Sequence, residues 1–381
     1  MRSPLAGAKD RFAYFIETES EPVGPGHPAW ERDLPGSREC RPSAGRPKGA
    51  IPFTVGAYFQ AAREFLEASG TIPASAPVHI FLAKHGAFYH PARVAAEISG
   101  RRVEFVLNVA LSEAGRELIH REFKTLQRLR QEFCPAWIPA VFACGEAACG
   151  GGIPVAMFLG EWLTGFHEFH LTRRAGSGET VVVLWDSDGG NRYLSREEAG
   201  RIYAGAARIL THYFNLLTGE CIHAWHHAAG DFVVNPAAGE PAVRLITVRD
   251  YRSMRRRRTA EAPAVEELLE SLLLFFLNLS IRMRLDRWDG VGEVAWSDPV
   301  AVEGSLNGFL EALAAKPDPP GAPLPIELLF RHYLLSLSPG YLLEVCRGLL
   351  ALFHPAAPDL PVASARLEEH VALLTDALGR R

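Results

Sequence analysis

The chain has 381 residues, enough for two domains or one large two-lobed domain. Apolar residues make up 48% and charged residues 22%, the composition of a globular protein that can bury a sizeable core. The formal net charge of −4 gives no electrostatic basis for binding nucleic acid, so we expect no nucleic-acid partner.

The cysteines and the hydrophobic stretches indicate a compartment. The six cysteines form no Cys-x-x-Cys pair, and their spacing fits neither a disulfide framework nor a zinc ribbon. The N-terminal residues lack the apolar core of a secretory signal. In the most hydrophobic stretch, residues 265–285, the unbroken apolar run is short, whereas a membrane-spanning helix needs about 20 apolar residues. We therefore predict reduced thiols, a buried core helix, no membrane partner and a cytoplasmic location.

The first half of the chain has the pattern of a small β-rich lobe. Residues 1–54 are predicted to form an extended N-terminal arm, because most of this segment is rich in Pro, Gly, Glu and Arg. Helical spacing predicts helices over 55–69 and 113–132. Five segments have the composition of strands: 78–83, 92–98, 103–111, 137–147 and 153–163. This order predicts an N-lobe over 55–163, with the second helix packed on a mixed sheet.

From residue 164 to 381 we predict a mostly helical C-lobe. A capping box, Ser195 to Glu198, opens a helix that is predicted to end at Gly219. The segment 222–251, IHAWHHAAGDFVVNPAAGEPAVRLITVRDY, has a different pattern. It predicts two short strands joined by a turn, with histidines and aspartates at their mouth.

This order of elements resembles the protein-kinase-like fold over roughly residues 78–285. That superfamily includes small-molecule phosphotransferases of the aminoglycoside kinase type. The resemblance implies a two-lobed α+β fold, with ATP and magnesium as cofactors and the nucleotide site in the cleft between the lobes. Phosphoryl transfer in such a site depends on positioning and on neutralising charge. A Gly-rich loop and a strand lysine reach the phosphates, a helix glutamate holds the lysine, and an aspartate accepts the substrate proton. An asparagine and a second aspartate hold the metal.

The family pattern assigns three nucleotide-binding positions in the N-lobe. Gly86 is the one glycine in the turn KHGAFYHP, between the first two strand candidates. Asn108 stands on the third strand where the family has its lysine. Glu122, in HREFKTL, matches the helix glutamate. A solvated helix carboxylate is an equally good interpretation of Glu122.

The segment 222–251 supplies the catalytic and metal positions under the same resemblance. Asp231, in DFVV, falls on the metal-binding asparagine, and His226 falls where the catalytic aspartate belongs. Thr247 falls on the second metal-binding aspartate, and Asp250 follows three residues later. A shift of the loop would bring His227 or Asp250 into register. We therefore place His226, His227, Asp231 and Asp250 in the catalytic site, with Asp231 and Asp250 as metal ligands.

Three functions remain open from the residues. A degenerate kinase-like protein, or pseudokinase, would be a binding or regulatory module whose partner is another protein or a small molecule. A divergent phosphotransferase would use a histidine as general base, since imidazole titrates near neutral pH. A histidine-rich α/β metal-binding protein would use the HAWHH and HEFH clusters, although partly buried structural histidines are the simpler interpretation.

Overall fold

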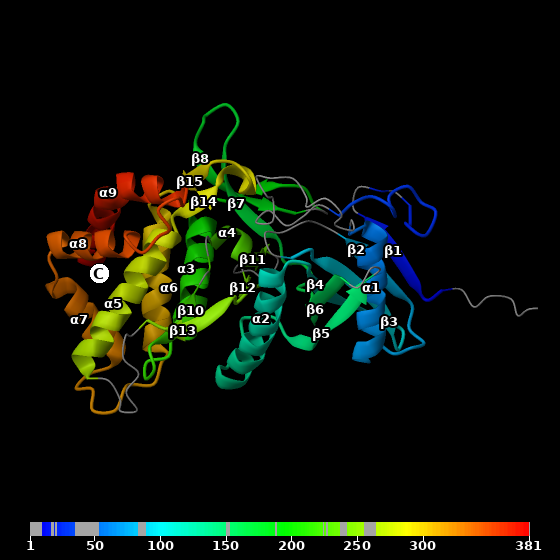
Figure 1. The fold of residues 1–381 in the computed structure, drawn as a ribbon. Coiled ribbons are helices and arrows are strands. Elements are labelled where there is room, and N and C mark those ends of the chain that lie inside the picture. Colours follow the sequence, from blue (N-terminus) through cyan, green and yellow to red (C-terminus); the bar gives the residue numbers. More distant parts are fainter. Residues whose placement is uncertain are drawn as a thin grey trace, which may run out of the picture. The chain divides into compact units, whose positions relative to one another are not determined.

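The computed structural model of the chain divides into two compact units (Figure 1). The N-terminal unit comprises Met1–Arg128 and Pro139–Thr164, and the C-terminal unit comprises Leu129–Ile138 and Gly165–Arg381. The first is rich in strands and the second is rich in helices, so the predicted α+β class is confirmed. The structure describes residues 10–16, 19, 21–34, 53–82, 89–149, 153–186, 189–223, 225, 228–236, 242–254 and 264–380.

A twisted sheet organises the N-terminal unit. Among the described residues it has six strands in the order β1-β2-β3-β4-β6-β5. Neighbours are antiparallel except for β1 and β2, which run parallel. The strands are β1 Phe12–Ile16, β2 Val78–Leu82, β3 Ala92–Ile98, β4 Arg101–Ala110, β5 Val141–Cys149 and β6 Ile153–Glu161. Each of the five predicted strands is present, with ends that differ by a few residues.

The prediction of an extended arm over residues 1–54 is wrong for Phe12–Ile16. These residues form β1, which pairs with β2 in register from Phe12 opposite Val78. Phe12 and Tyr14 are both buried, and the Tyr14 ring lies 4.9 Å from the ring of Phe59. Alternating aromatic residues therefore stabilise this edge strand, although the surrounding composition is that of a loop.

Helix α1 spans Val55–Ser69 and helix α2 spans Glu113–Glu132, whose last residues belong to the C-terminal unit. Thr54 caps α1 by accepting a hydrogen bond from the backbone N–H of Ala57, and Gly70 ends it with a φ of 63°. Helix α1 packs against β5 and β6, and its side chains join those of alternate sheet residues, such as Leu107 and Leu159, in one core.

Helices α3 and α6 form the centre of the C-terminal unit. Their glycines allow the backbones to touch, because a Cβ added to Gly308 would overlap the carbonyl of Ala204, and one added to Gly304 would lie 2.7 Å from the carbonyl oxygen of Gly200. The helices of this unit are α3 Arg196–His212, α4 Ala228–Asp231, α5 Val265–Arg282, η3 Trp288–Gly290, α6 Val300–Ala314, α7 Ile326–Ser336, α8 Pro339–Leu350 and α9 Asp359–Gly379.

The predicted start of α3 is confirmed, but its predicted end at Gly219 is wrong. The capping box of Ser195 and Glu198 is present. The helix stops at His212 because Asn215 accepts hydrogen bonds from the backbone N–H groups of Leu217 and Thr218, forming a turn. Gly219 follows this turn with a left-handed φ of 66° and leads into the next strand.

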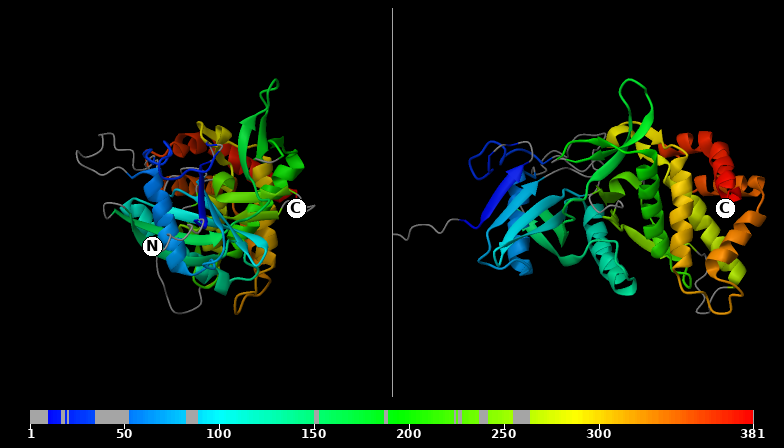
Figure 2. Two further views of the ribbon diagram at one scale, coloured as in Figure 1. Left: turned by 90° about the vertical axis from the view of Figure 1, so that its right-hand side faces the viewer. Right: turned by 180° about the vertical axis from the view of Figure 1, so that it is seen from behind.

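The C-terminal unit also contains short strands, some of which the sequence pattern did not indicate. Strands β7 to β9 form an antiparallel sheet, and the hairpin of β7 and β8 projects from this unit (Figure 2). The strands are β7 Glu168–Arg173, β8 Thr180–Trp185, β9 Arg192–Tyr193, β10 Glu220–His223, β11 Phe232–Asn235, β12 Ala242–Leu245, β13 Asp250–Ser253, β14 Leu285–Arg287 and β15 Val294–Trp296.

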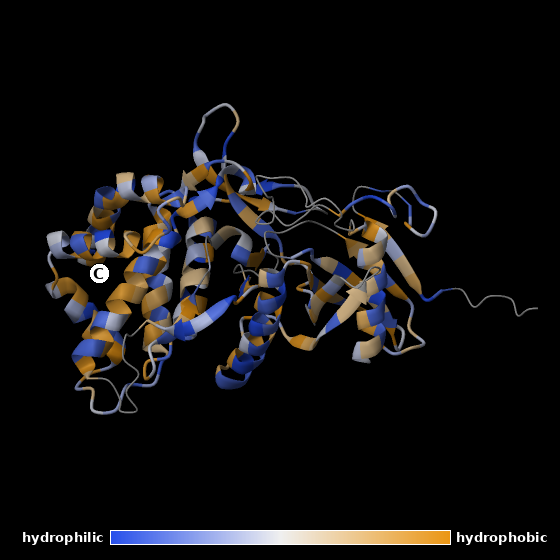
Figure 3. Ribbon diagram, viewed as in Figure 1, coloured by the Kyte–Doolittle hydropathy of each residue, from blue (hydrophilic) through white to orange (hydrophobic). Residues whose placement is uncertain are grey.

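Helix α5 is the most apolar helix predicted from the sequence. It packs against α6, α7 and α8, and Leu272, Phe276 and Leu277 are fully buried. Figure 3 shows hydrophobic residues along both α5 and α6. Across the described residues, the helices are all too short or too polar to span a membrane. The burial of these three α5 side chains confirms the prediction of a buried core helix.

Candidate functional site

Two strand pairs organise the segment 222–251, and in the sequence one pair lies inside the other. The inner pair is the pair of short strands that the sequence predicts. Strand β11 pairs with β12, and outside them β10 pairs with β13. The chain therefore leaves β10, enters β11, returns through β12 and ends beside its own start in β13. The backbone N–H of Ile246 donates to the carbonyl of Asp231, which ties the two connecting segments together. This arrangement brings residues near 231 beside residues near 249.

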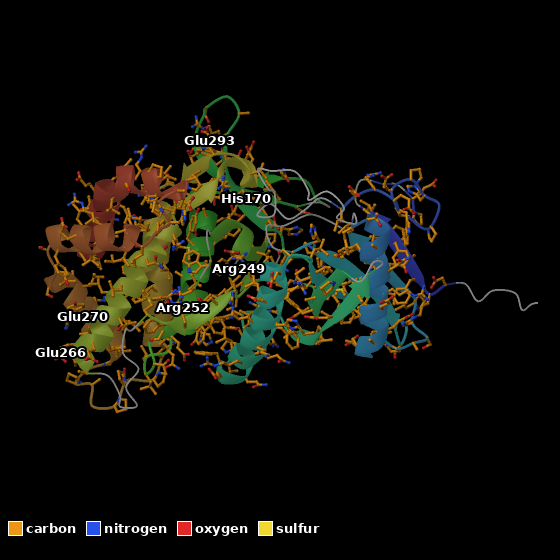
Figure 4. The ribbon with its side chains drawn as sticks, viewed as in Figure 1. His170, Arg249, Arg252, Glu266, Glu270 and Glu293 are labelled. Atoms are coloured by element: carbon orange, nitrogen blue, oxygen red, sulfur yellow. The ribbon has the colours of Figure 1, made fainter. Side chains whose placement is uncertain are left out.

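Asp231 and Arg249 form a partly buried ion pair between these segments. The Arg249 Nη2 atom lies 2.9 Å from the Asp231 Oδ1 atom, and the two side chains are 19% and 6% exposed. Gly230 precedes the aspartate with a φ of 84°, a left-handed backbone that favours glycine. The carboxylate predicted to hold a metal therefore binds a guanidinium. Figure 4 labels Arg249, the residue that supplies it.

Asp250, the second predicted metal ligand, binds a different arginine. Its Oδ2 atom lies 3.1 Å from the Nε atom of Arg252, on the same strand. Asp250 pairs with His223 across β10 and β13. The two aspartates thus each contact a guanidinium. That these aspartates share one pocket with His226 and His227 stays a prediction.

Of the predicted nucleotide-binding residues of the N-terminal unit, Asn108 lies on β4 and Glu122 lies on α2. Asn108 pairs with Phe158 across β4 and β6, and it alternates with Leu107 and Val109, which belong to the core under α1. Glu122, on α2, is buried and accepts a 2.7 Å hydrogen bond from the Tyr89 hydroxyl. The rings of Tyr89 and Phe158 lie 6.4 Å apart, so Phe158 neighbours both Asn108, on the adjoining strand, and Tyr89, which is the hydrogen-bond partner of Glu122.

Gly86, His226 and His227 lie outside the described residues. Their predicted roles stay predictions. His223, the first histidine of HAWHH, is described, and its Nε2 atom lies 3.2 Å from the carbonyl oxygen of Arg252 and 3.4 Å from the Cys221 sulfur. Burial lowers the pKa of His223, and the residue pairs with Asp250 across β10 and β13.

His170, the last histidine of the HEFH cluster, lies between two carboxylates. His170 is buried, with Nδ1 3.4 Å from Asp286 and Nε2 3.7 Å from Glu168 (Figure 4). Burial alone would lower the pKa of His170, but hydrogen bonds and charges of these two carboxylates outweigh it and raise the pKa to about 9. Within the described residues, no three His, Cys, Asp or Glu side chains converge as a metal site.

The C-terminal unit also contains a cavity of about 160 Å³ that the sequence pattern did not indicate. Apolar side chains and Tyr203 line it, and two loose ion pairs stand at its border, each with N and O atoms 3.6 Å apart: Arg174 with Glu179, and Arg196 with Asp298. Its lining comes from β7, β8, α3 and the start of α6, outside the segment 222–251. These residues are far apart in sequence, so periodicity carries no signal for them.

Comparisons with known proteins are sparse. No protein-family model matches the chain, and no curated protein matches it. One solved structure to which it is similar is described as WaaP in complex with acyl carrier protein. The two sequences are 13% identical, and the alignment covers 69% of this chain and 86% of that chain, with a TM-score of 0.32.

Proposed function

We propose that the protein has a kinase-like architecture that has lost phosphoryl transfer and acts as a binding or regulatory module. The ion pair of Asp231 with Arg249 is the observation that carries this proposal. Under the resemblance, Asp231 falls on a metal-ligand position, and its carboxylate instead contacts a guanidinium 2.9 Å away. The partner of such a module is another protein or a small molecule.

The charge of Arg249 opposes magnesium at this position. A divalent cation bound to the Asp231 carboxylate would stand next to a fixed positive charge in a partly buried environment, where like charges repel strongly. Thr247, at the position of the second metal ligand, offers a neutral hydroxyl in place of a carboxylate. Both features reduce the negative charge that magnesium requires.

The strand position supports the same conclusion. Asn108 carries no charge to place beside a phosphate, whereas the family's lysine supplies a full positive charge. Glu122 is buried and accepts a hydrogen bond from Tyr89. Because electrostatic positioning is most of the catalysis of phosphoryl transfer, the uncharged Asn108 and Thr247 together favour binding without turnover.

The experiment is a thermal-shift series with ATP, ATP plus magnesium, and ATP plus manganese. A ligand that binds the folded state raises its melting temperature by mass action. We expect the two metals to add nothing to any shift that ATP produces, and no hydrolysis of ATP. The matched control replaces an exposed carboxylate on α9, Asp376→Ala, which should behave as the parent protein. Robust magnesium-dependent transfer that Asp231→Ala abolishes and Asp376→Ala preserves would instead establish the divergent phosphotransferase.

A further inference from the structure

Three polar side chains of the N-terminal unit form a continuous chain of contacts. The Cys144 sulfur lies 3.4 Å from Nδ1 of His120, and Nε2 of the same ring lies 3.1 Å from Oε1 of Glu146. Cys144 and Glu146 are alternate residues of β5, so they project to the same face, and α2 supplies His120 to that face. The order is therefore thiol, imidazole and carboxylate, built from two elements.

The carboxylate determines the tautomer of the histidine. An ionised carboxylate only accepts hydrogen bonds, so Nε2 of His120 carries the proton that it donates to Glu146. Nδ1 is then an acceptor and faces the thiol proton of Cys144. A nucleophile, a base and a group that orients the base are thus each within contact distance, which is the arrangement that activates cysteine and serine nucleophiles.

Access and surrounding charge permit a reaction at this site. Cys144 is half-buried on the edge strand of the sheet, while 39% of the His120 side chain and 52% of the Glu146 side chain are exposed. At Cys144, the positive charge of Lys124, one turn further along α2, opposes the negative charge of Glu146. On the neighbouring strand β6, the residue opposite Cys144 is the uncharged Phe158. Small neutral reagents can therefore approach without an electrostatic barrier.

We propose that Cys144 is a nucleophilic thiol, with His120 as its general base, that undergoes exchange with small disulfides. Nδ1 of His120 takes the thiol proton as the sulfur attacks one sulfur of the disulfide. The new S–S bond forms as the old one breaks, and the departing thiolate takes the proton from the imidazolium. Cys144 is oxidised to a mixed disulfide, and the other half of the reagent is reduced to a free thiol. Glu146 stabilises the imidazolium in between.

The thiol needs this base because it is protonated at rest. Burial, with a further contribution from the charge of Glu146, raises the pKa of Cys144 to about 11, and the charge of Lys124 opposes this effect. Without a base, the thiolate that attacks disulfides would be scarce near neutral pH. A variant that lacks the imidazole should therefore react in proportion to hydroxide, with a rate that rises about tenfold per pH unit toward pH 11.

The test measures the rate at which 2-hydroxyethyl disulfide modifies each cysteine of the full chain at pH 7, by acid quenching and peptide mapping. We expect Cys144 to react faster than the exposed Cys134. His120→Ala and His120→Gln should each slow modification of Cys144 by at least tenfold, in line with general-base effects of about 10²–10⁴. Modification of Cys134 in the same samples should be unchanged, which provides an internal control.

Two further readouts separate a base from a merely structural contact. Free imidazole should restore part of the Cys144 rate in His120→Ala, and the dependence of that rate on pH should be shallower in the parent protein than in either variant. Thermal melting reports whether the variants remain folded, and His120→Gln keeps a polar side chain if His120→Ala unfolds. Equal rates of Cys144 and Cys134 in the parent, or a Cys144 rate that neither variant lowers, would overturn the proposal.

Discussion

Arg249 and Asp231 are bound to each other across two connecting segments of the C-terminal unit, with Nη2 and Oδ1 2.9 Å apart. The backbone pairing of Ile246 with Asp231 holds the same two segments. Asp231 directly precedes β11 and Arg249 directly precedes β13. The contact therefore joins the inner strand pair to the outer one, and it has a structural role whatever the function of the site. The following predictions test that role and the packing of both units.

Removal of Arg249 should destabilise the protein. Arg249→Ala removes the charge next to a carboxylate that is 6% exposed, and breaking a buried ion pair costs about 3–5 kcal/mol. The free energy of unfolding in urea measures the effect. The control is Arg252→Ala, because the Arg252 side chain is 68% exposed and its pair with Asp250 should contribute less than about 1 kcal/mol. Similar losses in the two variants would contradict a buried role for Arg249.

The interaction of His170 with its carboxylates should make stability depend on pH. Its pKa is raised from the ordinary 6.5 to about 9, so the stabilisation is complete below pH 6.5 and is lost as the pH rises through 9. At about 1.4 kcal/mol per pKa unit, the loss is roughly 3 kcal/mol. Urea unfolding between pH 6 and 10 should show the parent protein approaching His170→Gln as the pH rises. A constant difference between the two would refute the assignment.

The close approach of α3 and α6 should be intolerant of a single methyl group. In Gly308→Ala the new Cβ would overlap the backbone carbonyl of Ala204, and backbone cannot yield as a flexible side chain does. We expect a loss of about 1–3 kcal/mol or more. Gly348→Ala on α8 is the matched control, because nothing lies within 4 Å of its Cβ and alanine favours a helix by about 0.5–1 kcal/mol. Thermal unfolding should move in opposite directions in the two variants.

The hydrogen bond from Tyr89 to Glu122 should stabilise the N-terminal unit. The acceptor is a buried carboxylate 2.7 Å from the hydroxyl, and hydrogen bonds to charged groups contribute about 1.5–3 kcal/mol. Tyr89→Phe removes the hydroxyl and keeps the ring beside Phe158. Its midpoint of urea unfolding should fall, whereas that of Tyr341→Phe, at a tyrosine that is 48% exposed, should stay at the parent value.

Local pattern was sufficient to predict several of the helices and five of the strands of the N-terminal sheet. Helix α1 between Thr54 and Gly70, the capping box of α3 and the apolar helix α5 follow from residues within one or two turns of each other. Strands β2 to β6 of the N-terminal sheet follow from short apolar runs bounded by turn residues. The α+β class depends on the order of these elements, and it too could be predicted from the sequence.

Contacts between distant residues could not be predicted in this way. Strand β1 lies within a loop-like composition, and its position depends on burial of Phe12 and Tyr14 beside a strand more than 60 residues later. The ion pair of Asp231 with Arg249, the hydrogen bond of Tyr89 to Glu122 and the contacts of His120 with Cys144 and Glu146 join separate elements. Periodicity reports which face of an element is apolar, but which polar side chains meet depends on the packing of those faces in three dimensions.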